Sequence, residues 1–270
     1  MTEALSRLVR DHKTLVIYLS TAALLLGFYF TLDALRRTHE AEIADRFTLA
    51  VEQLRQDRVE IRVGGIYALE RIAVVSDKDY GIVVEILTTY VRERSAWKDT
   101  NTPVADQLLS KRAPDIQAVL SVLGRRARTY QDGEVERLNL ARTDLRRANL
   151  GGANLAGAVL SGAHLEGANL SGARLKGTIL RGTHLEQAGL QYADLREAFL
   201  GDARLDGASL KGANLEEAYL IGAHFEGANL LEADLRGVIG LTWDQIKTAF
   251  RDGGTRLPDY LRATRPLSRD

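Results

Sequence analysis

The stretch ANLGGANLAGAVLSGAHLEGANLSG, residues 148–172, decides the fold, because a leucine returns at every fifth position with an alanine two places before it. The five-residue period runs from Leu140 to Leu235 through twenty positions, and Phe225 is its one exception. A period of five fits neither the 3.6 residues per turn of a helix nor the two-residue alternation of a flat strand. The sequence therefore predicts a coiled β-solenoid whose leucines point inward.

The repeating unit reads Ala-Asn/Asp-Leu-X-Gly in residues 148–152 and 168–172, and it recurs with a changed last position in residues 213–217. In this unit and its consecutive copies the chain resembles the pentapeptide repeat family. The resemblance implies a right-handed quadrilateral β-helix, in which four pentapeptides form the four sides of one coil. The repeats of residues 136–240 then make about five coils, stacked as in other solenoids.

Residues 14–32 (TLVIYLSTAALLLGFYFTL) form a nineteen-residue run without a charged side chain. As a helix this run is about 28 Å long, which is close to the hydrocarbon thickness of a bilayer. A cleaved signal peptide would have a shorter apolar region and a small-x-small cleavage pattern. A buried core helix is the other alternative, but basic residues flank the run at Arg7, Arg10, Lys13, Arg36 and Arg37.

We therefore expect residues 14–32 to be a transmembrane helix in contact with the lipid bilayer, in a single-pass protein of the cell membrane. Basic residues on both sides of the run leave the side of the soluble part undecided. The stretch from Arg46 to Trp97, with its GGIYALERIA run at residues 64–73, resembles a region ahead of the repeats in membrane-anchored members of the family.

The remaining sequence divides by its apolar spacing. Helical spacing predicts helices near residues 43–54, 59–73, 79–94 and 114–128. The predicted divisions are an N-terminal tail and transmembrane helix (1–33), a small all-α domain (34–130), the β-helix (136–240), a C-terminal capping helix (241–252) and a flexible tail (253–270). Gly64-Gly65 indicates close helix packing, since the Lys-Ser/Thr of a phosphate loop is missing. Thr242 to Gln245 has the spacing of a capping box, which makes Trp243 a candidate apolar lid on the last coil.

Residues twenty apart stack on each other if four pentapeptides make one coil. On one face the residue just before the central leucine is apolar in successive coils, whereas two other faces carry polar residues there. This apolar column consists of Val159, Ile179, Phe199, Tyr219 and Ile239, with Ile221 beside it. Large exposed apolar patches mark contact surfaces. The column is therefore the predicted interaction site, for an unknown protein partner, for a second copy of the chain or for the helical domain.

Another face carries a histidine ladder with a parallel row of acids. The ladder is His164, His184, Arg204 and His224, and the acids are Glu166, Glu186, Asp206 and Glu226. Imidazoles and carboxylates can bind a divalent metal or respond to pH. We interpret the ladder as a solvated row of charges, because metal sites need convergent side chains and a second shell, which a flat exposed face lacks. The sequence thus predicts no metal and no cofactor.

The composition excludes several classes of function. The 36 acidic and 36 basic side chains give no electrostatic signature of nucleic-acid binding, and the absence of cysteine excludes thiol catalysis. The sequence contains no catalytic or phosphate-binding motif in a workable context. We therefore predict a non-enzymatic membrane-anchored scaffold that presents a rigid β-helix for protein interaction and binds no nucleic acid.

The resemblance also implies an alternative function, since some pentapeptide repeat proteins imitate duplex DNA and protect DNA gyrase. Such mimics are strongly acidic along the rod. Residues 136–240 contain 13 acidic and 11 basic residues, which argues against this alternative.

Overall fold

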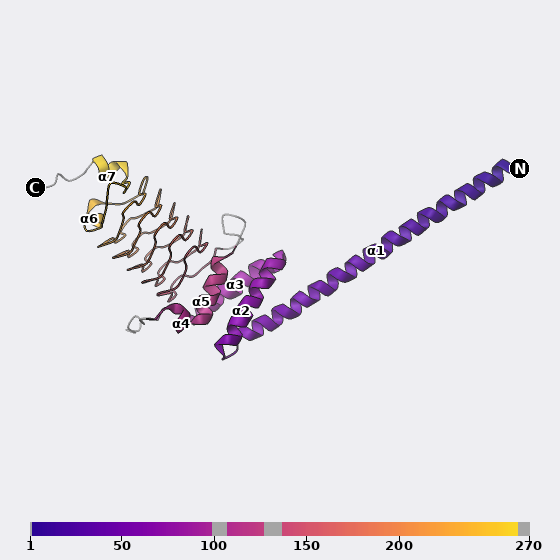
Figure 1. The fold of residues 1–270 in the computed structure, drawn as a ribbon, viewed down its shortest axis with the longest axis horizontal. Helices are drawn as coiled ribbons and strands as arrows, with labels where there is room; N and C mark the ends of the chain where they lie inside the picture. Colours follow the sequence, from indigo (N-terminus) through magenta and orange to yellow (C-terminus); the bar gives the residue numbers. More distant parts are fainter. Residues whose placement is uncertain (1, 99–106, 127–136, 264–270) are drawn as a thin grey trace, which may run out of the picture. The chain divides into compact units, whose positions relative to one another are not determined.

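The computed structural model describes residues 2–98, 107–126 and 137–263, and for residues 2–23 it gives the backbone alone. The chain forms two compact units, Met1–Leu49 and Ala50–Asp270. Figure 1 shows the helices and the stacked coils in chain order.

The N-terminal unit belongs to a single long helix, α1, which runs from Thr2 to Leu54 (Figure 1). Residues 14–23 of the predicted membrane span lie outside the residues whose side chains are described. Residues 24–32 are exposed, and the charged residues Asp33, Arg36 and Arg37 follow them.

Among the helices that the structure describes, none is both long and apolar enough to cross a membrane. The predicted localisation, a single-pass protein of the cell membrane, is therefore wrong on this finding. The transmembrane helix and the bilayer contact predicted for residues 14–32 have no support for the same reason.

The helical part of the second unit precedes the coils. Its elements are α2 (Val59–Val75), α3 (Asp77–Arg94), α4 (Leu109–Arg112) and α5 (Pro114–Gly124). Helices α2, α3 and α5 pack against one another around side chains such as Ile66, Leu87 and Leu120, which are 1% exposed or less. Three of these helices lie where the apolar spacing predicts them, and Pro114 stands in the first turn of α5 as expected. Residues 127 and 128 of the last predicted helix lie outside the described part.

A buried carboxylate joins the three packed helices. Asp115 of α5 accepts hydrogen bonds through Oδ2 from Nε of Arg62 in α2, at 2.8 Å, and from the hydroxyl of Tyr90 in α3, at 2.6 Å. Burial and the hydrogen bond to Asp115 together raise the pKa of Tyr90 to about 12. Burial alone would raise the pKa of Asp115, but its hydrogen bonds to Tyr90 and Arg62 outweigh burial and lower it. The Asp115 carboxylate therefore stays charged in the helix interface.

The coils form a β-helix solenoid of four sides. Parallel bridges pair residues twenty apart, from Asn139 with Val159 through to Tyr219 with Ile239. Each side of a coil contributes a single bridging residue. Residues 137–263 therefore contain isolated bridges and no extended strand. Every central residue from Leu140 to Leu235, including Phe225, is at most 2% exposed. The predicted β-solenoid with inward leucines is confirmed.

Each corner of a coil is a tight turn in which the amide of the small residue donates to the carbonyl of the preceding central residue, as from Ala148 to Leu145 at 3.0 Å. The residue just before that small residue has a positive φ in every repeat, between 56° and 72°. Glycine adopts this conformation without steric cost, and it occupies twelve of the twenty positions. At the other eight, among them Tyr192, the stacked coils impose the conformation on a side-chain-bearing residue.

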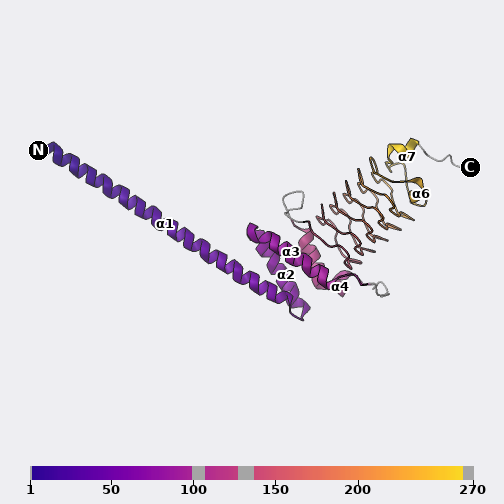
Figure 2. The ribbon, with the colours of Figure 1, turned by 180° about the vertical axis from the view of Figure 1, so that it is seen from behind.

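The first coil is closed by the helical part of the chain (Figure 2). Ala96 forms an antiparallel bridge with Thr143. The side-chain amide of Gln117 in α5 donates to the carbonyl of Asn149 at 2.8 Å and accepts from its amide at 2.9 Å. The carbonyl of Gly124 accepts from the amide of Asn154 at 2.8 Å. Three sides of the first coil thus have partners for their edge groups.

The last coil is closed by the segment after the repeats. Helix α6 (Trp243–Ile246) begins with the predicted capping box of Thr242 and Gln245, although it ends earlier than expected. The side-chain amide of Gln245 donates to the carbonyls of Leu220 and Ala223, both at 2.8 Å. Ile246, which is fully buried, is the apolar lid rather than the half-buried Trp243.

Part of the predicted tail lies against the same end. Arg256 of this tail forms a parallel bridge with Asp234, and Phe250, from the predicted capping helix, forms one with Asn229. A short helix, α7 (Asp259–Ala263), follows. Leu261 of α7 is 4% exposed. The chain therefore continues the solenoid with an irregular partial coil after residue 249, and residues 264–270 lie outside the described part.

Candidate functional site

The apolar column exists as a continuous row on one side of the solenoid. Parallel bridges join its members in the order Val159, Ile179, Phe199, Tyr219 and Ile239. The rings of Phe199 and Tyr219 stack with centroids 4.8 Å apart and planes 8° apart. The column becomes more open toward the last coils, since Val159 and Ile179 are half-buried whereas Phe199 is 40% and the neighbouring Ile221 62% exposed.

The histidine ladder also forms a row, and it begins one coil earlier than the sequence interpretation placed it. Parallel bridges join Asp144, His164, His184, Arg204 and His224. The acids pair with the ladder along each coil: Nδ1 of His164 lies 2.8 Å from Oε1 of Glu166, and Nδ1 of His184 lies 3.3 Å from Oε1 of Glu186. Arg204 bridges two coils, because its Nε lies 3.0 Å from the same Oε1 of Glu186.

The first ladder histidine is covered by an aromatic side chain from the helical part of the chain. The ring of Trp97 stacks on that of His164 with centroids 3.3 Å apart, and His184 stacks on the other face of His164 at 4.1 Å. The Arg146 guanidinium lies 5.0 Å from the Trp97 ring centre. Backbone pairing holds Trp97 in place, since its amide donates to the carbonyl of Arg142 at 2.8 Å. The side chain of His164 is consequently only 9% exposed.

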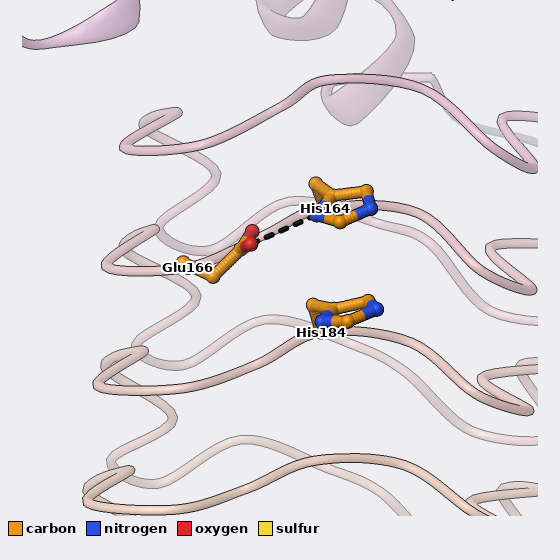
Figure 3. Close-up of side chains that lie close together, drawn as sticks. All are labelled: His164, Glu166 and His184. Carbon is orange, nitrogen blue, oxygen red and sulfur yellow. Dashed lines mark hydrogen bonds and ion pairs between the residues drawn. The ribbon is translucent and has the colours of Figure 1, made fainter. Parts of the chain in front are cut away.

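Three of these side chains converge, and we call them the histidine cluster: His164, Glu166 and His184. Figure 3 shows the two imidazoles one above the other with the Glu166 carboxylate beside them. One ligand atom from each lies within 4.8 Å of the other two. Oε2 of Glu166 and Oε2 of Glu186 are buried without a hydrogen-bond partner. At this end the ladder is therefore not the solvated row of charges inferred from sequence, whereas the exposed His224 fits that description.

An ion-paired carboxylate lies directly before the histidine cluster. Asp144 binds Arg112 of α4 through Nη1 at 3.0 Å and Arg146 through Nη2 at 2.8 Å. Burial would raise the pKa of Asp144, but hydrogen bonds from Arg146 and Arg112 outweigh it and lower the pKa to about 2. The Asp144 carboxylate is therefore ionised and paired with these two arginines, and it joins the helical part to the first coil.

Sequence reasoning could have found Asp144 but not Trp97. Asp144 precedes His164 by one full coil, so the twenty-residue phase assigns it to the ladder. Trp97 lies outside the repeats and far from His164 in sequence, and no periodicity connects the two. The contact depends on how the segment after α3 pairs with the first coil.

Comparisons with known proteins agree with this architecture. The family profile described as Pentapeptide repeats matches with eight copies, over residues 139–177, 168–207 and 203–239. A search of curated proteins gave no match.

Several solved pentapeptide repeat proteins are similar to part of this chain. The pentapeptide repeat protein Rfr23 from the cyanobacterium Cyanothece 51142 is 41% identical over 35% of this chain and 63% of its own, with a TM-score of 0.32. HetL from Nostoc, described as involved in heterocyst differentiation regulation, is 32% identical over 37% of this chain and 55% of its own, with a TM-score of 0.31. This chain thus covers less than two thirds of both proteins. A thylakoid lumen protein of Arabidopsis thaliana is 30% identical over 43% of this chain and 80% of its own, with a TM-score of 0.29.

Proposed function

Because the chain belongs to the pentapeptide repeat family, we propose that it is a non-catalytic protein-interaction module whose binding surface is the apolar column. The observation that carries this proposal is the exposed stack of Phe199 and Tyr219, which continues into Ile221 and Ile239. A row of apolar side chains on a water-facing surface gains free energy when a partner covers it, at about 25 cal/mol per Å² of apolar area buried.

The backbone around the column favours binding. Each column residue is bridged to the coil before or after it, and the coils lie at the strand spacing of about 4.8 Å. Side chains on such a scaffold lose little backbone freedom when a partner binds, which leaves more of the contact energy as affinity. Aromatic side chains are also the ones most enriched among residues that dominate binding energy.

The binding partner that we propose is a protein surface with a complementary apolar row. That surface belongs either to a second copy of this chain or to another protein. The proposal does not extend to DNA mimicry, because residues 136–240 carry nearly balanced charge, with 13 acidic and 11 basic residues.

Site-specific photo-crosslinking tests the proposal in cells that produce the chain. A photo-reactive phenylalanine analogue replaces Ile221, which is 62% exposed beside the column. We expect one dominant crosslinked species, either a dimer of the chain or a complex with one other protein. Its yield should fall at least about fivefold when Phe199→Ser and Tyr219→Ser are added, because these changes remove the aromatic contacts at the centre of the column.

The control places the same analogue at Arg174, an exposed residue on a polar face that occupies the repeat position of Phe199 and Tyr219. Equal crosslinking from position 174, or an unchanged yield in the doubly substituted protein, would contradict a role for the column. The circular dichroism spectrum of the Ser variants must match that of the original chain, so that a loss of yield reports the surface and not the fold.

A further inference from the structure

We propose that His164, Glu166 and His184 form a binding site for one divalent transition-metal ion, most suitably Zn²⁺. The site joins two successive coils at the end of the solenoid where Trp97 covers the ladder. This inference concerns a different face from the apolar column and is independent of the proposed interaction surface.

The first argument is convergence. Two imidazoles and a carboxylate offer ligand atoms that all lie within 4.8 Å of one another. Ligands at the 2.0–2.2 Å typical of zinc lie roughly 3–4 Å apart in a tetrahedral site. The ligand atoms of the histidine cluster therefore need to approach one another by about an ångström to surround an ion, besides the ring tilt described below.

The second argument is the unsatisfied acceptor in the cluster. Oε2 of Glu166 is buried and has no hydrogen-bond partner, and the same holds for Oε2 of Glu186 in the next coil. A buried polar atom without a partner costs about 1–3 kcal/mol, and more when it is charged. A cation bound beside Glu166 would offset this cost, which the pairing of Glu166 with His164 alone does not remove.

The third argument concerns how the imidazoles are held. The His164 ring is fixed between Trp97 and His184, and its side chain is 9% exposed. The side chain of His184 is 28% exposed and has no ring on its other face among the described contacts. The two rings are nearly parallel, at 13°, so a metal cannot lie in both ring planes. His184 is the ring that must tilt toward the ion, while His164 provides the fixed ligand.

Outer contacts support the ligands in the way that metal sites require. Glu186 contacts Nδ1 of His184 at 3.3 Å and is itself held by Nε of Arg204 at 3.0 Å. A carboxylate that holds Nδ1 in this way leaves the other ring nitrogen, Nε2, to bind the ion, and such partners change metal affinity by about 10- to 100-fold. These contacts and the cover of Trp97 provide the convergence and second shell that the sequence interpretation expected to be missing.

The ligand types select the class of ion. Imidazole nitrogens suit zinc, copper and nickel, whereas calcium and magnesium require oxygen ligands throughout. The chain has no cysteine and only five histidines, so few other side chains compete for a transition metal. Three protein ligands leave one tetrahedral position for water.

Isothermal titration calorimetry of the full-length chain with ZnCl₂, after removal of any affinity tag, tests the site. We expect one ion per chain with a Kd in the micromolar range or below. His184→Asn should weaken binding at least about tenfold, since it removes one of three ligands. Asn occupies the same repeat position at Asn154 and Asn169, so this change fits the solenoid. Glu166→Gln should have a similar effect and keeps the shape of the side chain.

His224→Asn is the matched control, because His224 lies in the same ladder but outside the cluster. We expect its zinc affinity to stay within about twofold of the original. Titration with Co²⁺ gives a second readout, a visible absorption band that should appear in the original chain and disappear in His184→Asn. The proposal is overturned if no saturable binding occurs, if His184→Asn and Glu166→Gln bind zinc as tightly as the original, or if His224→Asn loses affinity equally.

Discussion

At the scale of single residues, Asp144 is the carboxylate on which arginines from two parts of the chain converge. Arg112 belongs to α4 and Arg146 to the first coil, and the side chain of Asp144 is 16% exposed. Replacing it by Asn removes the charge that balances both guanidinium groups. The charged Arg146 side chain, which is only 8% exposed, would then lack the Asp144 carboxylate in a largely buried position.

We expect Asp144→Asn to lower the free energy of unfolding at pH 7 by about 3 kcal/mol, the cost of breaking a largely buried ion pair. Chemical denaturation followed by circular dichroism measures this change. Asp244→Asn is the control, because the Asp244 side chain is 94% exposed, and it should change stability by less than about 0.5 kcal/mol. Equal stability of both variants would show that the Asp144 pairs contribute nothing.

The same residue predicts a dependence on pH. The folded-state pKa of Asp144, about 2, lies below the ordinary value of 3.8, so the charged form stabilises the fold. This contribution, about 2.5 kcal/mol, is complete above pH 4 and is lost as the pH falls through 2. The original chain should therefore lose more stability between pH 5 and pH 2 than Asp144→Asn does. Parallel pH profiles of the two proteins would contradict the assignment.

At the scale of elements, the paired glycines of α2 have different roles. A Cβ atom on Gly65 would lie 2.7 Å from the carbonyl oxygen of Ala50 and 2.8 Å from Cβ of Gln53, whereas a Cβ on Gly64 would meet nothing within 4 Å. The close helix packing inferred from the sequence is thus confirmed for Gly65 alone. Gly64 is exposed on the outer side of the helix.

We expect Gly65→Ala to destabilise the chain by about 2 kcal/mol, because α2 would have to move away from the end of α1. Gly64→Ala should instead stabilise it by up to about 1 kcal/mol, since alanine has the higher helix propensity. Thermal unfolding of the two variants side by side gives the measurement. Shifts of the same sign would mean that the contact at Gly65 does not limit the packing.

Some elements could not be predicted from the sequence. Helices α4 and α7 are four and five residues long, too short to show a helical period. The partial coil after α6 lacks the leucine repeat, so Phe250 and Arg256 gave no sign that they would pair with the last coil. In each case the position depends on the solenoid already being present as a surface to pack against.

At the scale of the whole molecule, the columns exist only because a coil contains twenty residues. Deleting residues 191–210 removes one complete coil and stacks Tyr219 on Ile179. Deleting residues 191–200 keeps the pentapeptide pattern but moves Tyr219 two sides around the rod. Both deletions remove Phe199, so they differ in the register of the columns and not in the aromatic residue lost.

We expect both deletion proteins to fold, because stability in solenoids is close to a sum over neighbouring repeats. Circular dichroism and cooperative thermal unfolding would establish this. Crosslinking from position 221 should persist after the twenty-residue deletion and fall severalfold after the ten-residue deletion, which divides the apolar column between two faces. If the ten-residue deletion crosslinks as well as the other, a continuous column is not the binding surface.

The five-residue period predicts the interior and the columns because each coil repeats the same local environment, so the partner of a residue is always twenty positions away. The five-residue period alone places Leu195 inside the solenoid and Phe199 on its outer surface. The period carries no information about contacts made once, such as Trp97 on His164. The exposure of the histidine cluster was misjudged from sequence for that reason.

The two glutamines that help to close the ends of the solenoid, Gln117 and Gln245, bear on whether the protein stays a discrete particle. A bare terminal coil is a template onto which another copy could add, as in the end-to-end growth of cross-β fibres. Gln117 both donates to and accepts from the backbone of the first coil, and Gln245 donates to two carbonyls of the last, so both bind backbone groups that an incoming chain would need. Together with the bridges of Ala96, Phe250 and Arg256, these contacts occupy both ends of the rod, so we expect its length to be set by the chain itself and not by its concentration.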